Sequence, residues 1–346
     1  MQTYLSTSLQ RPETRVLAMI SGLWMSRLVA FAVRNGVFDE LLERPCSAED
    51  LAARKGLSSD VVRRLLLGLV HLGLLRHQGT AFALADDGRL LLQDSPTGFA
   101  AMTRLWSELF DGAWQTLDET ARTGEPGFNI VHGEPIFVRI GRDKTVAGVF
   151  DAAMSGLATI IAVEAAHCLC RSELTTICDV GGGDGSLLRH IIAASPHVRG
   201  IVFDQPHVVD RAKASAATAG QATAGQEIAF VGGDFFASVL LAPSHILSNV
   251  IHDWSNEDAI RILKNVWAAQ PAGGTLYLVE MMLDDVNEPI LARSTDLNML
   301  MLTGGRERTR ADFDALLAQA GFEIARVEKL ADLSCLITAQ RIDAAR

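Results

Sequence analysis

The chain has 346 residues and a formal net charge of −10, and 49% of its residues are hydrophobic while 21% are charged. This composition excludes a disordered chain, because it offers enough apolar surface for a sizeable core. The acidic balance argues against a protein that binds nucleic acid through its phosphates, which needs concentrated positive charge. The five cysteines form no disulfide pattern, which indicates a reducing compartment.

The first fifteen residues lack a charged start followed by an apolar core, so we predict no signal peptide. The most apolar long run, residues 154–170, is short for a membrane span and contains Glu164 and His167. We interpret it as a buried or dimer-interface helix. We therefore expect a cytoplasmic protein that does not enter a membrane.

The first part of the chain predicts a winged-helix domain over residues 1–98. Apolar residues at helical spacing predict a helix over residues 14–42. Ser47 and Gly56 suit the start and the end of a second helix, and a third apolar helix follows. Two strand-like pieces around a glycine turn, in "LLRHQGTAFALA", then complete the order helix, turn, helix and β-wing.

A winged helix raises the alternative of a DNA-binding regulator. The second helix of that motif offers Arg63, Arg64 and His71, opposed by the acidic Asp60. Two arginines on a solvated face are ordinary, so we favour use of this domain as a scaffold or for dimerisation, with no nucleic acid partner.

Residues 99–346 predict a larger domain, which begins with a cluster of aromatic residues. Trp106, Phe110 and Trp114 recur every four residues, which predicts one apolar face of a helix. This face either packs into the core or forms the wall of a pocket for a flat aromatic ligand. On the second interpretation, Trp106 and Phe110 are candidate substrate contacts.

From residue 176 onward, apolar strand-like runs alternate with helices. The runs are "TTICDV", "GIVFD", "EIAFVGG", "HILSNVI" and "TLYLVE". This alternation predicts an α/β fold with a parallel sheet and crossover helices. The tail, "FEIARVEKL" followed by "LSCLITAQ", predicts a final antiparallel hairpin on the sheet.

A glycine-rich stretch, "DVGGGDGS", begins at Asp179, follows the first of these strands and opens a helix. Gly181, Gly183 and Gly185 let the backbone approach a ligand closely, and the helix start offers free N–H groups. A dinucleotide site requires Gly-x-Gly-x-x-Gly, and the spacing fails from Gly181 and from Gly183 alike. A nicotinamide or flavin cofactor is therefore disfavoured.

The next strands end in side chains suited to a nucleoside. The second strand ends at Asp204, where a carboxylate is placed to hold two ribose hydroxyls. The third ends in Gly233, Asp234 and Phe235, an acid and an aromatic ring suited to an adenine edge and face. The carboxyl ends of parallel strands share one edge of the sheet, where open α/β folds bind ligands.

The fourth strand delivers a histidine, His252, to the same edge. A neutral imidazole near pH 7 is suited to act as a general base, although a histidine in a helix cap or in the core is the alternative. Glu280 ends the fifth strand and can accept the proton of the other ring nitrogen.

The motifs "DVGGGDGSLL", "FDQPHVV", "GGDFF", "HDW" and "GGRERT" together resemble the small-molecule S-adenosylmethionine-dependent O-methyltransferases of the acetylserotonin and caffeic acid type. The resemblance covers nearly the whole chain and implies a Rossmann-like methyltransferase domain behind a dimerising winged helix. It also implies a homodimer and the product S-adenosylhomocysteine.

The resemblance assigns further roles to residues of this chain. It implies that the three glycines line the methionine part of the cofactor, and that Glu280 and Glu307 bracket the base, His252. Ser248 stands where plant members carry a lysine near the adenine. With Asp179 and Trp254, it completes the expected cofactor contacts. Four positions match or approach substrate-contacting positions of the family: Phe150, Met154, Asn298 and Leu302.

The implied reaction is attack by a phenolate oxygen of an aromatic secondary metabolite on the sulfonium methyl group, with no metal. Two alternatives keep the fold and the cofactor: N-methylation, and hydroxylation or decarboxylation of an aromatic antibiotic intermediate. The histidine and both acids favour O-methylation.

Overall fold

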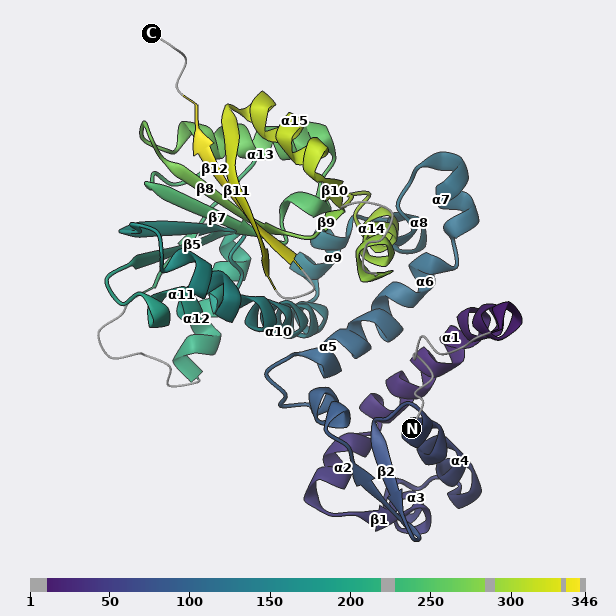
Figure 1. Ribbon diagram of the computed structural model, residues 1–346. Coiled ribbons are helices and arrows are strands. Elements are labelled where there is room, and N and C mark those ends of the chain that lie inside the picture. Colours follow the sequence, from purple (N-terminus) through teal and green to yellow (C-terminus); the bar gives the residue numbers. More distant parts are fainter. Residues whose placement is uncertain (1–10, 219–227, 284–289, 331–333, 343–346) are drawn as a thin grey trace. The chain divides into compact units, whose positions relative to one another are not determined.

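The computed structural model describes residues 11–218, 228–283, 290–330 and 334–342 (Figure 1). These residues divide into two compact units. The first unit runs to residue 111 and includes residues 148–156, and the second comprises residues 112–147 and those from 157 onward. The first ten residues, which belong to the segment without a predicted signal peptide, lie outside the described part.

The first unit is a winged helix in which helices surround a small sheet with strand order β1-β3-β2 (Figure 1). The Ser47 side chain accepts a hydrogen bond from the backbone of Asp50, and Gly56 ends that helix in the left-handed conformation, as the sequence predicted. The elements are α1 (Pro12–Arg34), α2 (Val37–Glu43), β1 (Cys46–Ser47), α3 (Ala48–Lys55), α4 (Ser59–His71), β2 (Leu75–Gln78), β3 (Ala81–Leu84), η1 (Asp87–Leu91), α5 (Phe99–Arg104) and η2 (Leu105–Phe110).

The helix predicted over residues 14–42 is in fact two helices. Gly36 has φ of +61°, a backbone conformation that glycine adopts without steric cost, and it separates α1 from α2. Apolar spacing alone does not reveal this break, because apolar residues continue both before and after Gly36.

The helix α1 carries an exposed apolar surface. Leu17 is 65% exposed and Trp24 is 66% exposed, and the surface also includes Val16, Met19, Ile20 and Leu23. By length and composition, α1 and α10 (Lys144–Leu169) could cross a membrane. This is weak evidence, since long apolar helices of soluble proteins meet the same criterion.

The aromatic cluster at the end of the first unit differs from the predicted α-helical face. The segment η2 is a π-helix, so the spacing of four residues no longer matches its turn. Trp106 is 51% exposed, whereas Phe110 is 4% exposed. The two rings therefore do not share one environment.

The second unit contains a seven-stranded sheet. Its strands are β4 (Thr176–Val180), β5 (Arg199–Asp204), β6 (Ala229–Gly232), β7 (Ser244–Ser248), β8 (Thr275–Glu280), β11 (Phe322–Leu330) and β12 (Ser334–Arg341). Its other elements are α6 (Asp111–Trp114), α7 (Leu117–Thr123), α8 (Gly127–His132), α9 (Ile136–Arg142), most of α10, α11 (Ser186–Ala194), α12 (Pro206–Thr218), η3 (Ile251–Asp253), α13 (Asn256–Ala268), β9 (Met282–Leu283), α14 (Ile290–Leu302), β10 (Arg308–Thr309) and α15 (Arg310–Ala320).

The strand order is β11-β12-β8-β7-β4-β5-β6. The five strands β4 to β8 are parallel, and the hairpin β11-β12 joins β8 in antiparallel register. The predicted α/β fold, with a mostly parallel sheet and a final antiparallel hairpin, is confirmed. The chain order reverses on either side of β4, and open α/β sheets bind ligands beside such a reversal.

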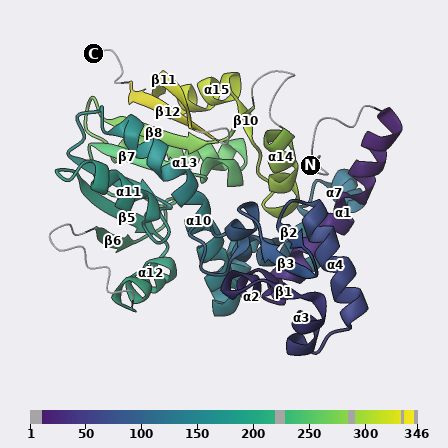
Figure 2. The same ribbon diagram turned by 60° about the horizontal axis from the view of Figure 1, so that its bottom comes forward.

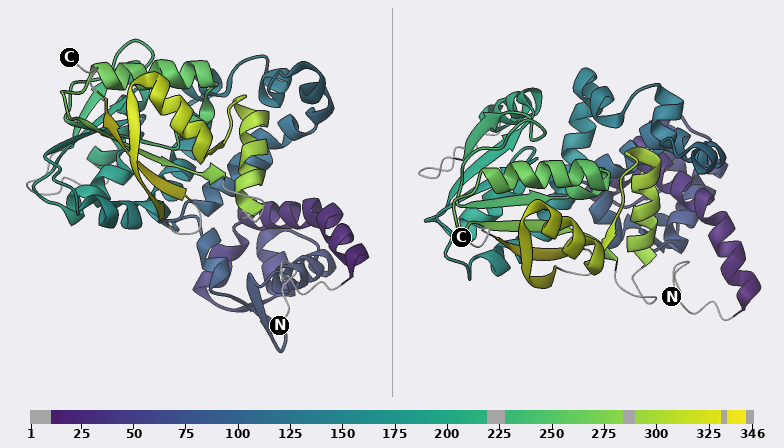
Figure 3. Two further views of the ribbon diagram at one scale, coloured as in Figure 1. Left: turned by 45° about the horizontal axis from the view of Figure 1, so that its top comes forward. Right: turned by 90° about the horizontal axis from the view of Figure 1, so that it is seen from above.

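Helices cover both faces of this sheet (Figures 2 and 3). Apolar side chains of α13 and α15, such as Leu263 and Leu317, form one core against the sheet. The second half of α10 and α11, with Leu169 and Leu188, form another core against it. The parallel strands are therefore buried between two layers of helices, and their carboxyl ends are held at one edge.

Candidate active site

The glycine-rich loop follows β4 and leads into α11. Gly181, Gly183 and Gly185 all have positive φ angles, of +77°, +56° and +80°. A Cβ atom at Gly181 would lie 2.8 Å from Val250, whereas a Cβ at Gly183 would meet nothing within 4 Å. The loop therefore packs tightly at its start and leaves open space at its centre, where a ligand can approach the backbone.

Two acids lie beside this loop. The Asp204 carboxylate at the end of β5 accepts a hydrogen bond from the N–H of Gly183 at 2.9 Å. Asp179 is 1% exposed, and its Oδ1 has no hydrogen-bond partner among the described residues. Burial raises the pKa of Asp179 to about 8. A fully buried oxygen without a partner fits a site that a polar ligand group completes.

Aromatic side chains gather beyond the end of β6. The indole of Trp254 makes edge-to-face contacts with Phe235 and Phe236, and Phe137 stacks on it with ring centroids 5.7 Å apart. The Asp234 carboxylate accepts a hydrogen bond from the N–H of Phe236, which fixes the turn. This arrangement can receive a flat base beside a carboxylate.

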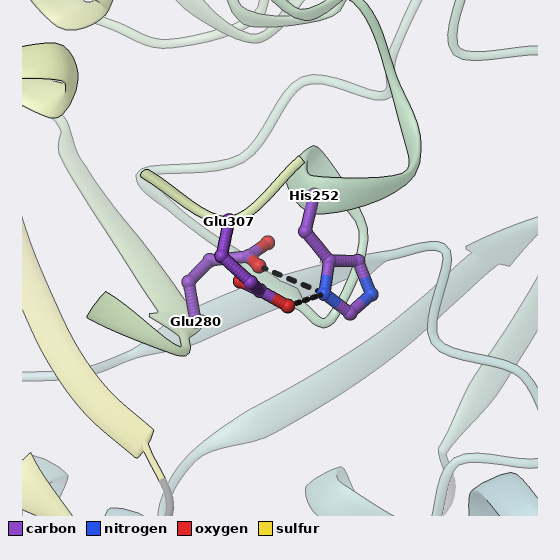
Figure 4. Close-up of side chains that lie close together, drawn as sticks. All are labelled: His252, Glu280 and Glu307. Carbon is purple, nitrogen blue, oxygen red and sulfur yellow. Dashed lines mark hydrogen bonds and ion pairs between the residues drawn. The ribbon is translucent and has the colours of Figure 1, made fainter. Parts of the chain in front are cut away.

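His252 lies in the short helix η3, which follows β7, and its side chain is 14% exposed. Its Nδ1 lies 2.8 Å from Oε1 of Glu307 and 3.9 Å from Oε2 of Glu280 (Figure 4). The sequence suggested that Glu280 accepts the ring proton, but Glu307 occupies that position. The other ring nitrogen of His252, Nε2, lies 3.9 Å from Oδ1 of Asp253, which is beyond hydrogen-bond distance. This nitrogen can therefore accept a proton from a ligand.

Glu280 has a different task at the end of β8. It is fully buried, and its Oε1 accepts hydrogen bonds from the N–H groups of Val250 and Ile251. Asn249 has φ of +51°, so the chain turns sharply after β7. The following two N–H groups face Glu280, which fixes the backbone just before His252.

Three carboxylates decide the charge of His252. Burial opposes its protonation, but Asp253, Glu280 and Glu307 together outweigh that effect and raise the pKa of His252 to about 10. Burial raises the pKa of Glu280 to about 7 and that of Asp253 to about 6. The site thus stabilises an imidazolium strongly, which is the form that a histidine base reaches after it accepts a proton.

The same three side chains could also hold a metal ion. One ligand atom from each of His252, Glu280 and Glu307 lies within 4.8 Å of the others. Oε2 of either glutamate is buried and has no hydrogen-bond partner in the described part of the chain. Histidine nitrogen and carboxylate oxygen are suitable zinc ligands, so the chemistry of the cluster admits a divalent cation.

The structure brings the expected cofactor residues together in the second unit, where they lie at or just after the carboxyl ends of β4, β5, β6 and β7: Asp179, Gly181, Gly183, Gly185, Asp204, Gly233, Asp234, Phe235, Ser248 and Trp254. Of the substrate candidates, Asn298 and Leu302 belong to α14 of this unit. The Trp114 indole donates a hydrogen bond to Oδ1 of Asn298 at 3.3 Å. The other candidates, Trp106, Phe110, Phe150 and Met154, belong to the first unit, and their role stays a prediction.

Several residues at this edge were missed by the sequence analysis. Asp296 on α14 accepts a hydrogen bond from the backbone N–H of Glu307. Arg308 is a fully buried arginine beside the same glutamate. "GGRERT" contains this arginine, but nothing in the motif distinguishes a buried guanidinium from a solvated one.

The sheet edge with the glycine-rich loop, and the buried histidine beside it, fit the class of α/β enzymes that bind a nucleoside-bearing cofactor. A comparison with family models makes this specific. The chain belongs to the O-methyltransferase family: residues 114–323 match the O-methyltransferase domain, and residues 17–94 match the O-methyltransferase dimerisation domain.

Individual relatives agree with this family. The chain is 32% identical to the phenazine O-methyltransferase PhzM of Lysobacter antibioticus, over 94% of this chain and 96% of the relative. It is 32% identical to the 8-amino-8-demethylriboflavin N,N-dimethyltransferase of Streptomyces davaonensis, over 86% and 87%. The crystal structure of human N-acetylserotonin methyltransferase in complex with SAM matches with a TM-score of 0.86 and 27% identity, covering 98% of this chain and all of that one. The protein is therefore an S-adenosylmethionine-dependent O-methyltransferase.

The open space above the glycine loop generates a prediction. Gly183→Ala and Gly124→Ala both place a Cβ at positive φ with nothing within 4 Å, and Gly124 lies at the end of α7, away from the loop. Each change should cost about 1–2 kcal/mol of backbone strain. Only Gly183→Ala should weaken S-adenosylhomocysteine binding, by tenfold or more in calorimetry, because its methyl group occupies the ligand's space. Equal affinities in the two variants would contradict this placement of the cofactor.

Proposed function

We propose that this enzyme transfers a methyl group from S-adenosylmethionine to a phenolic hydroxyl of a flat aromatic secondary metabolite, with His252 as the general base. The observation that carries the proposal is the placement of His252. Glu307 binds Nδ1, so Nε2 is the nitrogen that can take the acceptor's proton. The flat acceptor is supported by the similarity to a phenazine O-methyltransferase.

The residues that would hold the cofactor follow the strand ends in order. The glycine loop would receive the methionine part. The Asp179 carboxylate, whose Oδ1 has no hydrogen-bond partner among the described residues, packs against this loop at Gly182. Asp204 would hold the ribose hydroxyls in exchange for its bond to Gly183. Asp234 and the rings around Trp254 would receive the adenine. When bound, the cofactor supplies a methyl group on a positively charged sulfur, which is open to attack by an oxygen nucleophile.

His252 removes the acceptor's proton as the new bond forms. The O–H proton of the acceptor moves to Nε2 of His252, while the bound cofactor would supply the methyl group to the acceptor oxygen and would keep the electron pair of its sulfur–carbon bond. Glu307 keeps Nδ1 protonated throughout, and it stabilises the imidazolium that results. The charge of that imidazolium is matched by the buried carboxylates around it.

The raised pKa of His252 removes an energetic obstacle. A phenol ionises near 10 and an ordinary histidine near 6.5, so proton transfer to an ordinary histidine would cost about 5 kcal/mol. The carboxylates raise the pKa of His252 to about 10. Transfer between the two groups is then nearly balanced, although only a small fraction of the free enzyme carries a neutral imidazole at pH 7.

N-methylation is the second candidate, and the similarity to a riboflavin-type N,N-dimethyltransferase favours it. An aromatic amine has no acidic O–H proton to lose before attack, so it would depend less on a strong base. The buried pair of His252 and Glu307 therefore supports O-methylation better. NMR of the isolated product distinguishes a methoxy group from an N-methyl group, and its mass distinguishes methylation from hydroxylation or decarboxylation.

We propose a cytoplasmic homodimer that associates through the N-terminal unit. The dimerisation-domain match over residues 17–94 supports this, as does the exposed apolar surface of α1. A second copy that covers Leu17 and Trp24 would bury side chains that water otherwise surrounds. We propose no nucleic acid or membrane partner.

The experiment that tests the function is transfer of labelled methyl from S-adenosylmethionine to a panel of phenols and phenazine-like hydroxyls. His252→Ala should lower the rate by about 10²–10⁴-fold while S-adenosylhomocysteine binding is retained. His197→Ala, at an exposed histidine, is the matched control and should retain full activity. A His252→Ala enzyme as active as wild type at every pH would refute the assignment of the base.

The carboxylates around His252 predict an alkaline activity profile. Because the base must be neutral in the free enzyme, kcat/KM should rise with pH from 7 and level off near the raised pKa of about 10. Glu307→Gln removes a negative charge, so the pKa of His252 falls and the rise should move to lower pH by about 1–3 units. The plateau should also fall, since a weaker base drives transfer less. The free acceptor ionises in the same way in both assays, so it cannot cause a difference between wild type and Glu307→Gln. Superimposable pH profiles of kcat/KM would therefore disprove the effect of the Glu307 charge on His252.

We propose that catalysis needs no metal. Activity should survive dialysis against a chelator, because the neutral Nε2 of His252 accepts the proton without the help of a metal ion. Added Zn²⁺ should inhibit, because it would compete with the proton for the cluster of His252, Glu280 and Glu307. Loss of activity on chelation that Zn²⁺ or Mg²⁺ restores would show that this view of the cluster is wrong.

A further inference from the structure

Arg308 is the largest fully buried side chain among the described residues, at 1% exposure. Arginine is seldom buried to this extent unless its donors are paired. Here its hydrogen-bond acceptors include the carbonyl oxygens of Ile251 at 2.9 Å and Trp254 at 2.8 Å. Oδ1 of Asn256 accepts from Nε at 3.1 Å and from Nη2 at 3.0 Å.

These acceptors belong to residues on both sides of His252 in the sequence. Ile251 precedes it, Trp254 follows by two residues, and Asn256 begins α13. The guanidinium is a planar fork of donors with fixed angles, so it can hold several acceptors at once in a defined geometry. One side chain thus spans the whole turn that carries the base.

The segment around Arg308 binds this turn at further points. The N–H of Arg306 donates to the carbonyl oxygen of His252 at 2.8 Å, and Glu307 binds the imidazole itself. Glu280 holds the N–H of Ile251, while Arg308 holds the carbonyl of the same residue. The backbone on the N-terminal side of His252 is therefore fixed by an anion and a cation together.

The charge of Arg308 also suits its surroundings. Burial lowers the pKa of this guanidinium, and Glu280 opposes the effect, so the group keeps its proton. A buried cation beside Glu280 and Glu307 offsets part of the negative charge that the site concentrates. A lysine would keep the charge but would offer a single point of attachment in place of the fork.

We propose that Arg308 is a positioning residue for the methyl transfer, which holds the 251–256 turn so that His252 presents Nε2 to the acceptor. The proposal rests on the proposed role of His252 as the base. Among the described residues, the hydrogen bonds of the Arg308 side chain go to main-chain carbonyl oxygens and to Asn256, and not to the imidazole. Its contribution reaches the reaction through the orientation of the imidazole, which small displacements of the turn would change.

The test is a double-mutant cycle of Arg308→Lys with His252→Ala, with Arg310→Lys as the matched control. Arg310 is an exposed arginine that pairs with Asp314 on α15, so the same chemical change there should leave kcat unaltered. In the enzyme that contains His252, Arg308→Lys should lower kcat about 10–100-fold. In the His252→Ala background, the same change should alter the remaining rate by less than about threefold, because there is no imidazole left to orient.

A second measurement does not depend on activity. In the free protein, hydrogen exchange of the 250–256 backbone should quicken in Arg308→Lys and stay unchanged in Arg310→Lys. If Arg308→Lys does not fold, Asn256→Ala removes one acceptor of the fork and goes through the same cycle. Thermal melting of every variant identifies those that fold.

The outcomes distinguish the role of Arg308 from that of His252. A fully active His252→Ala enzyme would overturn the proposed base and with it the role of Arg308. If His252→Ala is impaired but Arg308→Lys costs the same factor in both backgrounds, the base stands and the positioning role is overturned. A folded Arg308→Lys enzyme with wild-type kcat would overturn the positioning role as well.

Discussion

The site depends on one imidazole held among carboxylates away from water. His252 would not stay protonated in an apolar pocket, because burial alone lowers the pKa of a histidine. Glu307 at 2.8 Å, with Glu280 and Asp253 nearby, reverses that effect. The same charges would be costly without their hydrogen bonds, so the backbone around them is ordered to supply these. The positions of Asn249, Glu280 and Arg308 follow from this requirement.

The sheet makes this arrangement possible. The parallel strands β4 to β8 end at one edge, and each contributes one part of the site in sequence order. β4 leads into the glycine loop, β5 ends at Asp204, and β8 ends at Glu280. The chain reverses beside β4, so the helical connections diverge there and leave the edge accessible. The expected cofactor residues and His252 therefore share one edge of the sheet although they are spread over residues 179–254.

Much of this was predictable, because strands and glycine loops are local features. The five strand-like runs and the final hairpin are present in the structure, and His252 ends up beside both predicted acids. Contacts between distant segments were not predictable: Arg308 and Asn256 lie 52 positions apart, and nothing in either segment indicates that they meet. The sequence likewise does not indicate that Glu307 binds the imidazole while Glu280 binds backbone N–H groups. These roles depend on which carboxylate lies near the turn after Asn249. The break at Gly36 and the π-turn at Trp106 were missed because apolar spacing does not report backbone dihedral angles.

In the proposed mechanism, the carboxylates hold His252 with its proton on Nδ1 and leave Nε2 to take the acceptor's proton. The most direct measurement is a ¹⁵N NMR titration of the imidazole in labelled protein with S-adenosylhomocysteine bound. We predict a single titration near pH 10, above which Nδ1 remains protonated and Nε2 is bare. A titration near the ordinary histidine value, or a neutral form that carries its proton on Nε2, would contradict the account.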